Sequence, residues 1–191
     1  MRVALEGADL RRRVAGAFRW RSDRTDKDMF ADVTGWWRDP GLLRDIAIGL
    51  AELFAVREPT LVLGLQSRGV LLGAVVAQHL GVGLVEIRKD PAPSTDSDAW
   101  LTATTPPDYR DRHLTLGVRR DLVQSGERVL LVDDWIATGG QALGARELVR
   151  RSGATWLGLA VVVDALDDRR LRHDLGVRAL LHERDLPQRP S

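Results

Sequence analysis

Two adjacent carboxylates follow a run of apolar residues in the middle of the chain. Asp133 and Asp134 come directly after residues 129–132, and a short loop at residues 137–140 leads into a segment with helical spacing. This pattern indicates a buried strand that delivers two acids to its carboxyl end, where ligands bind in open parallel sheets. Carboxylates suit sugar hydroxyls or a metal ion, and free N–H groups at a helix start suit a phosphate. The pattern predicts a pocket for a sugar phosphate.

Two other classes of phosphate-handling protein fit the sequence less well. A phospho-receiver domain also begins with a strand ending in paired acids, but the chain after Asp133 is about half as long as such a domain requires. Residues 64–69 have the glycine spacing of a nucleotide-binding P-loop, yet Val70 stands where that motif needs lysine. The sequence therefore excludes both.

Cations follow two further predicted strands. Ser67 and Arg68 come after residues 61–65, and Arg88 and Lys89 come after residues 83–87. The carboxyl ends of parallel strands meet at one edge of a sheet, so we expect these cations near the acid pair. Together they suit a substrate with several phosphates and free hydroxyls. The alternative for Arg88 and Lys89 is an ordinary solvated strand end.

The elements that position these groups alternate between strands and helices. Strands are predicted at residues 61–65, 83–87, 129–132, 156–163 and 177–182. Helices are predicted at residues 9–18, 39–53, 69–80, 138–151 and 167–173. This alternation predicts one α/β domain with a mainly parallel sheet and helices on both faces. Residues 19–34 are expected to be irregular, and residues 90–113, rich in Pro, Ser, Thr and Asp, to form a long loop.

Composition excludes several classes of function. The 28 basic and 27 acidic residues nearly cancel, so no general attraction to nucleic acid or to membranes is expected. Cysteine is absent and the four histidines are scattered, which excludes disulfides and thiolate metal sites and gives no metal-ligand spacing. No signal core or membrane span is found, so we expect a soluble, cytoplasmic protein. Trp36 and Trp37 suit packing or a dimer contact.

Residues 133–141 resemble the phosphoribosyl-pyrophosphate signature of type I phosphoribosyltransferases, with the adenine group the closest match. The likeness extends to residues 63–89, and to residues 29–53, which are similar to the segment that covers the base. The resemblance implies a single domain over residues 1–191, with a small N-terminal hood at 1–56. It places the core at 57–184, a flexible loop at 90–113 and a tail at 185–191.

The resemblance also implies roles for individual residues. The ribose hydroxyls would be held by Asp133 and Asp134. The 5′-phosphate would be held by Ala137, Thr138, Gly139, Gly140 and Gln141. The pyrophosphate would be faced by Ser67, Arg68, Arg88 and Lys89. The base would be flanked by Phe30 and Trp135. Catalysis would rest on Asp133, Asp134 and Arg68, with Mg²⁺ carried on the substrate rather than at a metal site of the protein.

The implied reaction moves the phosphoribosyl group from phosphoribosyl pyrophosphate to a ring nitrogen of a nucleobase and releases pyrophosphate. The expected acceptor is a purine, as in adenine salvage, and the expected assembly is a homodimer. Two alternatives stay open: a regulatory protein that binds the phosphosugar without turnover, and a biosynthetic transferase for an unusual heterocycle.

The chain departs from the family pattern at several positions. Gln141 stands where the family usually has a hydroxyl residue, and Trp135 replaces a smaller aliphatic residue beside the base. Ala31 replaces a basic residue common in adenine enzymes. In the long loop, Ala92 replaces a second lysine, and the family's Glu-Tyr cluster is reduced to Tyr109 with nearby Asp108 and Asp111. These departures leave the choice of acceptor open.

Overall fold

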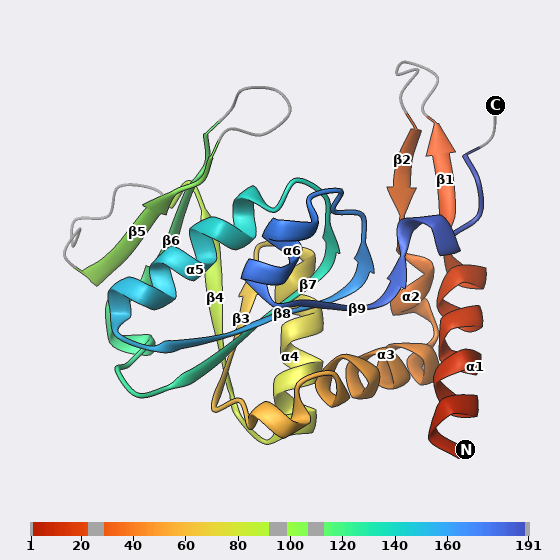
Figure 1. Cartoon of the computed structure of the whole chain (residues 1–191), viewed down its shortest axis with the longest axis horizontal. Helices are drawn as coiled ribbons and strands as arrows, with labels where there is room; N and C mark the ends of the chain where they lie inside the picture. The colour runs from red at the N-terminus through yellow and green to blue at the C-terminus, as the bar shows by residue number, and fades with distance from the viewer. Residues whose placement is uncertain (1, 23–28, 92–98, 107–112, 190–191) are drawn as a thin grey trace.

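A seven-stranded sheet forms the centre of the molecule (Figure 1). The computed structural model describes residues 2–22, 29–91, 99–106 and 113–189. The sheet has the order β5-β6-β4-β3-β7-β8-β9. Its strands are β3 (Leu61–Leu65), β4 (Gly83–Lys89), β5 (Trp100–Thr104), β6 (Thr115–Arg119), β7 (Arg128–Ile136), β8 (Thr155–Asp164) and β9 (Val177–His182). The neighbours β4, β3, β7, β8 and β9 pair in parallel. At the edge beyond β4, β6 pairs antiparallel with β4 and β5 pairs antiparallel with β6.

Helices cover both faces of this sheet. They are α1 (Arg2–Ala17), α2 (Gly35–Arg38), α3 (Pro40–Glu52), α4 (Arg68–Leu80), α5 (Gly140–Ser152) and α6 (Arg169–Leu175). The start of α3 follows from its sequence, because the Asp39 side chain accepts from the Leu42 backbone N–H at 2.6 Å and Pro40 occupies the first position. The predicted α/β fold, with a mainly parallel sheet flanked by helices, is confirmed.

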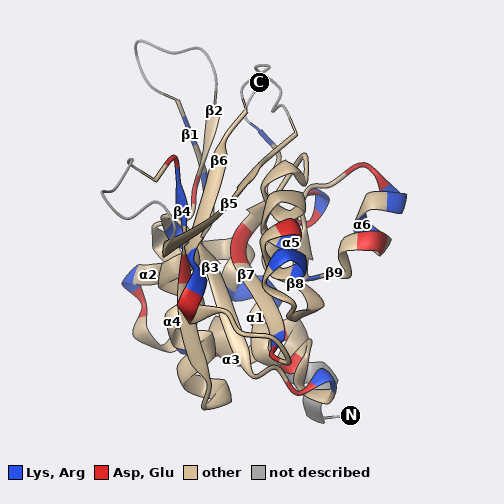
Figure 2. Cartoon of the chain, turned by 90° about the vertical axis from the view of Figure 1, so that its left-hand side faces the viewer, with Lys and Arg blue, Asp and Glu red and all other residues tan. Residues whose placement is uncertain are grey.

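The alternation of side chains along the strands divides the core into two layers. On one face, Val62 and Leu130 pack with residues of α1, α3 and α4 such as Leu72. On the other face, Leu63 and Leu131 pack with α5 and α6. Figure 2 shows α3 and α4 on one side of the sheet and α5 on the other. This sandwich fixes the carboxyl ends of the parallel strands, where the site residues lie.

Two segments expected to lack regular structure contain strands. The irregular stretch at 19–34 holds a hairpin of β1 (Arg19–Ser22) and β2 (Met29–Asp32), which pair antiparallel. The expected loop at 90–113 holds β5, so the expectation was wrong there. Leu101 and Ala103 point into the core while their neighbours stay accessible, which is the period-two pattern of a strand.

The N- and C-terminal segments are packed together. Trp36 is fully buried and its Nε1 donates to Val14 O at 3.0 Å, so this residue serves packing, while Trp37 packs partly buried against the same core. Leu186 is buried, and Trp20 Nε1 donates to Pro187 O at 2.8 Å. The segment expected to be a tail therefore packs against the hairpin as far as residue 189.

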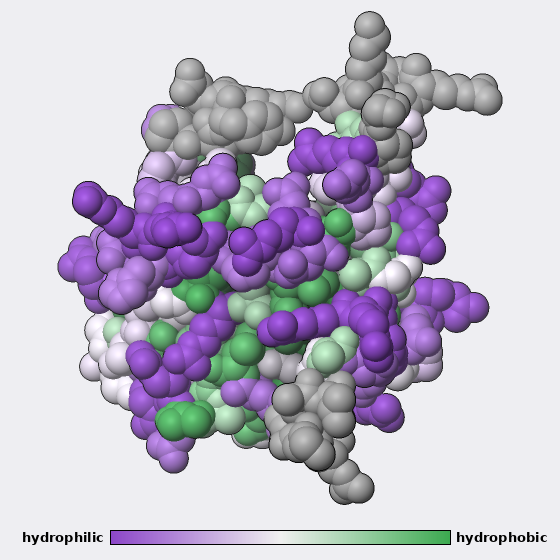
Figure 3. Space-filling model, turned by 45° about the vertical axis from the view of Figure 1, so that its right-hand side comes forward, coloured by the Kyte–Doolittle hydropathy of each residue, from purple (hydrophilic) through white to green (hydrophobic). Residues whose placement is uncertain are grey.

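Hydrophilic side chains cover much of the face shown in Figure 3, with hydrophobic ones between them. Within the described ranges, no helix combines the length and the apolar character needed to cross a bilayer.

Candidate active site

The acid pair lies at the carboxyl end of β7, where Figure 2 shows an acidic stretch beside α5. Asp134 is only 5% exposed, while Asp133 lines a cavity. The Asp134 backbone N–H donates to Asp133 Oδ1 at 2.9 Å. Burial, followed by the neighbouring Asp134 carboxylate, raises the pKa of Asp133 well above the usual range of an aspartate. The negative charge of Asp133 is therefore unfavourable in the empty site, and a hydroxyl or a cation of a ligand would stabilise it.

The predicted turn between β3 and α4 lies directly against the acids. Arg68 Nη1 is 3.0 Å from Asp134 Oδ2. That oxygen has no hydrogen-bond partner, and it is the only such buried side-chain atom among the residues the structure describes. The ion pair with Arg68 compensates the charge of this buried oxygen, and Asp133 is the carboxylate that faces the cavity.

Gly69 permits this close approach. A Cβ at this position would lie 2.9 Å from Asp133 Oδ1 and 2.9 Å from the backbone oxygen of Val132. Any larger residue would push the turn off β7, because real Cβ atoms almost never come so close. The glycine therefore brings the cationic turn and the acid pair into one site.

The loop after β7 presents a helix N-terminus to the same site. Gly139 precedes α5 with φ of 77°, a backbone conformation that favours glycine, and no side chain caps the helix. The first N–H groups of α5, from residue 140 onward, therefore face outward with the positive end of the helix dipole. The β5–β6 connection reaches this loop, since a Cβ on Gly140 would lie 3.5 Å from Pro106 O.

A cavity of about 410 Å³ lies between Asp133, Lys89 and the loop that precedes α5, whereas Ser67, Arg68 and Asp134 are not among its lining residues. Its polar walls come from Lys89, Asp133, Thr138 and Gln141, and its backbone walls from residues 137–140. Its apolar floor consists of Leu65, Leu114, Leu131, Ile136, Ala142 and Leu159. The predicted phosphate-loop residues thus share one cavity with an acid and a lysine. The sequence interpretation did not include the floor, which depends on long-range packing.

The side chains of the two predicted cations of β4 point to opposite faces of the sheet. Lys89 lines the cavity, and its backbone N–H donates to Gln66 Oε1 at 3.1 Å. Arg88 points to the other face, where its Nε lies 2.9 Å from Glu86 Oε2 and its guanidinium stacks over Trp100. β4 continues through both residues, so successive side chains alternate between faces. The structure does not bring Arg88 to the predicted pyrophosphate position.

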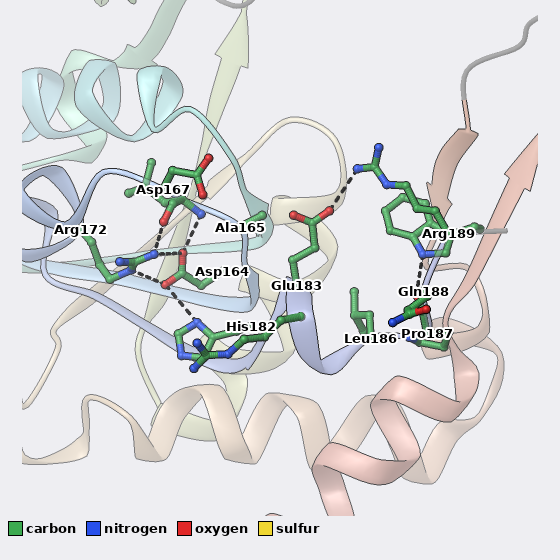
Figure 4. Close-up of a pocket in the computed structure, with 13 residues that line it drawn as sticks. Asp164, Ala165, Asp167, Arg172, His182, Glu183, Leu186, Pro187, Gln188 and Arg189 are labelled. Atoms are coloured by element: carbon green, nitrogen blue, oxygen red, sulfur yellow. Dashed lines mark hydrogen bonds and ion pairs between the residues drawn. The ribbon is translucent and has the colours of Figure 1, made fainter. Parts of the chain in front are cut away.

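A second cavity of about 550 Å³ lies at the ends of β8 and β9, and Figure 4 shows the residues that line it. Ile136, at the end of β7, pairs in register with Asp164, and the Ala165 N–H donates to Ile136 O at 2.8 Å. The cavity is lined by Trp20, Asp164, Ala165, Leu166, Asp167, Arg172, His182, Glu183, Arg184, Leu186, Pro187, Gln188 and Arg189. No motif marked these residues, because they come from three distant segments.

Comparison with known proteins fits this geometry. A family model for the phosphoribosyl transferase domain matches residues 39–182. The chain is 37% identical over 157 residues to the adenine phosphoribosyltransferase of Koribacter versatilis, covering 81% of this chain and 83% of the relative. It is 38% identical over 161 residues to the Dinoroseobacter shibae protein of that name, covering 83% and 82%. The chain belongs to the phosphoribosyltransferase family.

Solved structures agree in fold. The adenine phosphoribosyltransferase of Rhodothermus marinus matches this phosphoribosyltransferase with a TM-score of 0.78 at 32% identity, over 92% of this chain and 99% of that one. The Saccharomyces cerevisiae enzyme, complexed with adenine and an imino-altritol bisphosphate, matches with a TM-score of 0.76 at 30% identity, over 91% and 99%.

Of the two residues predicted to flank the base in this phosphoribosyltransferase, one lines a cavity and the other does not. Trp135 lines the first cavity, and its ring stacks on Phe18 with centroids 6.0 Å apart and meets the edge of Trp20 at 6.3 Å. Phe30 lies on β2, is 52% exposed and lines neither of these cavities. Trp135 therefore links the hairpin to β7 and also lines the cavity, and its role beside a base stays a prediction.

The other departures from the family pattern concern two regions. Gln141 lines the first cavity next to the phosphate loop, and Ala31 lies on β2. Ala92, Asp108, Tyr109 and Asp111 lie outside the described residues.

Proposed function

We propose that this protein transfers the 5-phosphoribosyl group from phosphoribosyl pyrophosphate to a ring nitrogen of a nucleobase, with adenine as the first acceptor to test, and releases pyrophosphate. The observation that carries the proposal is the convergence of Asp133, Lys89 and the open N-terminus of α5 on one cavity, next to the ion pair of Arg68 with Asp134. The names of the relatives favour adenine. A homodimer stays a prediction.

The groups divide the substrate between them. The N-terminus of α5 and the loop at 137–140 bind the 5′-phosphate, because no side chain caps the helix and its first N–H groups have no partner within it. Asp133 and Asp134 accept from the ribose hydroxyls, with Asp133 lining the cavity and Asp134 held beside it by Arg68. Ser67, Arg68 and Lys89 face the pyrophosphate, whose charge increases as it leaves.

Magnesium enters with the substrate. No group of three or more metal-ligating side chains that could hold a metal occurs among residues 2–22, 29–91, 99–106 and 113–189. The acid pair alone suits a partly hydrated ion already held by the substrate's oxygens. When bound, the ion supplies charge neutralisation to the leaving pyrophosphate. The protein's own contribution is to hold the ribose and the leaving group so that positive charge can develop at the anomeric carbon.

The decisive experiment measures pyrophosphate release from phosphoribosyl pyrophosphate and Mg²⁺ with adenine, guanine, hypoxanthine, xanthine, uracil or orotate. We expect release that depends on the base, with adenine the most active. A phosphosugar that raises the melting temperature without turnover of any base would favour the regulatory alternative. Failure of the phosphosugar to bind would overturn the proposal.

The two neighbouring cations of β4 form a matched test. Lys89→Ala is expected to raise the KM for phosphoribosyl pyrophosphate by about 10- to 100-fold, because a charge-assisted contact contributes about 1.5–3 kcal/mol. Arg88→Ala removes only an exposed ion pair with Glu86 and a stacking contact, so its KM should stay within about fivefold of wild type. Steady-state kinetics with varied phosphosugar compare the two. Equal effects of both substitutions would contradict the assignment of Lys89.

A further inference from the structure

The cavity between β8, β9 and the hairpin carries a polar group that the proposed function leaves unused. His182, at the end of β9, lines it with a side chain that is 47% exposed. In Figure 4 this imidazole lies beside Asp164 and Arg172. The cavity size falls in the range of about 300–1,000 Å³ that is typical of small-molecule sites.

The proposed reaction needs a proton acceptor. A ring nitrogen that carries hydrogen must lose it as its bond to the sugar forms, and a positioned base at that point contributes about 10²–10⁴-fold. The stretch from Trp135 to Thr138, which follows the acid pair, has no titratable side chain. Asp133 and Asp134 are assigned to the ribose. The next candidates lie on β8 and β9, since Ile136 of β7 pairs with Asp164 of β8, and Asp164 pairs with His182 of β9.

Asp164 is held firmly in place to orient this histidine. Its side chain is 2% exposed, and Arg172 Nε donates to its Oδ2 at 2.6 Å. The Leu166 backbone N–H donates to its Oδ1 at 2.9 Å. His182 Nδ1 lies 3.6 Å from Asp164 Oδ2. The Asp164 carboxylate thus places a negative charge beside this imidazole at ion-pair distance.

A second wall is closed by the segment after β9. Arg189 lies over the Trp20 ring at 4.5 Å and pairs with Glu183 at 3.1 Å. Trp20 also touches the edge of Trp135, which lines the first cavity. The two cavities therefore share an aromatic boundary, and a planar heterocycle in the second would lie beside a phosphosugar in the first.

The geometry points to His182 as the group that receives the acceptor's proton, with Asp164 as its positioning residue and a planar heterocycle bearing a ring N–H as the ligand of this cavity. This inference rests on the proposed function. In the step, the ring nitrogen forms a bond to the anomeric carbon and the bond from that carbon to the pyrophosphate oxygen breaks. The ring proton passes to the unprotonated ring nitrogen of His182, its bonding electrons stay on the heterocycle's nitrogen, and pyrophosphate leaves as an anion.

The test compares His182→Ala with His173→Ala, a control histidine whose side chain is 92% exposed on α6. We expect His182→Ala to lower kcat by about 10²-fold or more. The melting-temperature shift caused by phosphoribosyl pyrophosphate should stay unchanged, because the first cavity is intact. Added imidazole should restore part of the lost kcat, which a purely structural role would not allow. His173→Ala should behave as wild type.

Three results would overturn the assignment. They are unchanged kcat in His182→Ala, a loss that imidazole does not restore, and a loss of phosphosugar binding together with activity. The proposed function fails separately, if the wild-type protein does not bind the phosphosugar. A wild-type protein that binds it but turns over no acceptor would overturn both the transfer step and the role of His182.

Discussion

Asp133→Asn is expected to abolish most of the transferase activity and, in the absence of ligand, to make the protein more stable at neutral pH. The substitution removes a charged acceptor of the ribose hydroxyls, and loss of one such preorganised group costs about 10²–10³-fold in rate. The same carboxylate is unfavourable in the empty site, because burial and Asp134 raise its pKa. Function and stability therefore change in opposite directions.

The sign of the pH dependence follows from that shift. An aspartate whose folded-state pKa is raised holds a proton that the unfolded chain releases, so the folded state binds more protons. The free energy of unfolding must then fall as pH rises from about 4, the ordinary aspartate value, through the raised pKa of Asp133. Asp133→Asn should flatten this fall.

Thermal unfolding between about pH 4 and about pH 8 measures the effect, with pyrophosphate release measured on the same samples. Asp121→Asn is the control, because Asp121 is an exposed acid paired with Arg119 at 3.5 Å far from the cavity. A variant that keeps wild-type activity would contradict the site. A variant that melts below wild type at neutral pH would contradict the inferred charge strain.

Gly69→Ala is expected to destabilise the protein and to impair turnover together. The new methyl group would meet Asp133 Oδ1 and the backbone oxygen of Val132, each at 2.9 Å. A backbone atom cannot move aside as a flexible side chain can, so the turn must shift. Overpacking of this kind costs about 1–3 kcal/mol. The shift also carries Arg68 away from Asp134, so kcat/KM should fall by about 10-fold or more.

Gly16→Ala provides the matched control. Gly16 lies in α1 and a Cβ there would meet nothing within 4 Å. Gly16 lies in the last turn of α1, and alanine is favoured over glycine in a helix by at most about 1 kcal/mol, so this variant should not lose stability and should keep its activity. Urea unfolding and steady-state kinetics test both. The close-approach argument fails if Gly69→Ala is as stable and active as Gly16→Ala.

The parallel half of the fold was predictable because its signals are local. The run of apolar residues in β3, β7 and β8 identifies buried strands, and the cap at Asp39 marks the start of α3. The hairpin was not predictable in the same way. In β1, three of four side chains are exposed, so no hydrophobic alternation distinguishes the strand from a loop.

The sequence contained a signal for two other features that the interpretation missed, the strand β5 and the opposite directions of Arg88 and Lys89. Leu101 and Ala103 alternate with threonines in β5, but the surrounding Pro, Ser and Asp residues outweighed that pattern. Arg88 and Lys89 are neighbours on one strand, and a strand directs neighbours to opposite faces. The second cavity left no such trace, because Trp20, Asp164 and His182 meet only after the chain has folded.

The positions of Trp20 and Trp135 allow ligand binding to be followed by intrinsic tryptophan fluorescence. Trp135 lines the first cavity and Trp20 the second, whereas Trp36 is sealed in the core and Trp100 lies at the outer edge of the sheet. Indole emission depends on local polarity and on nearby quenching groups. Phosphosugar binding should therefore change the fluorescence of Trp135, and acceptor binding that of Trp20. Single-tryptophan replacements by phenylalanine would let each cavity be titrated separately, without a label.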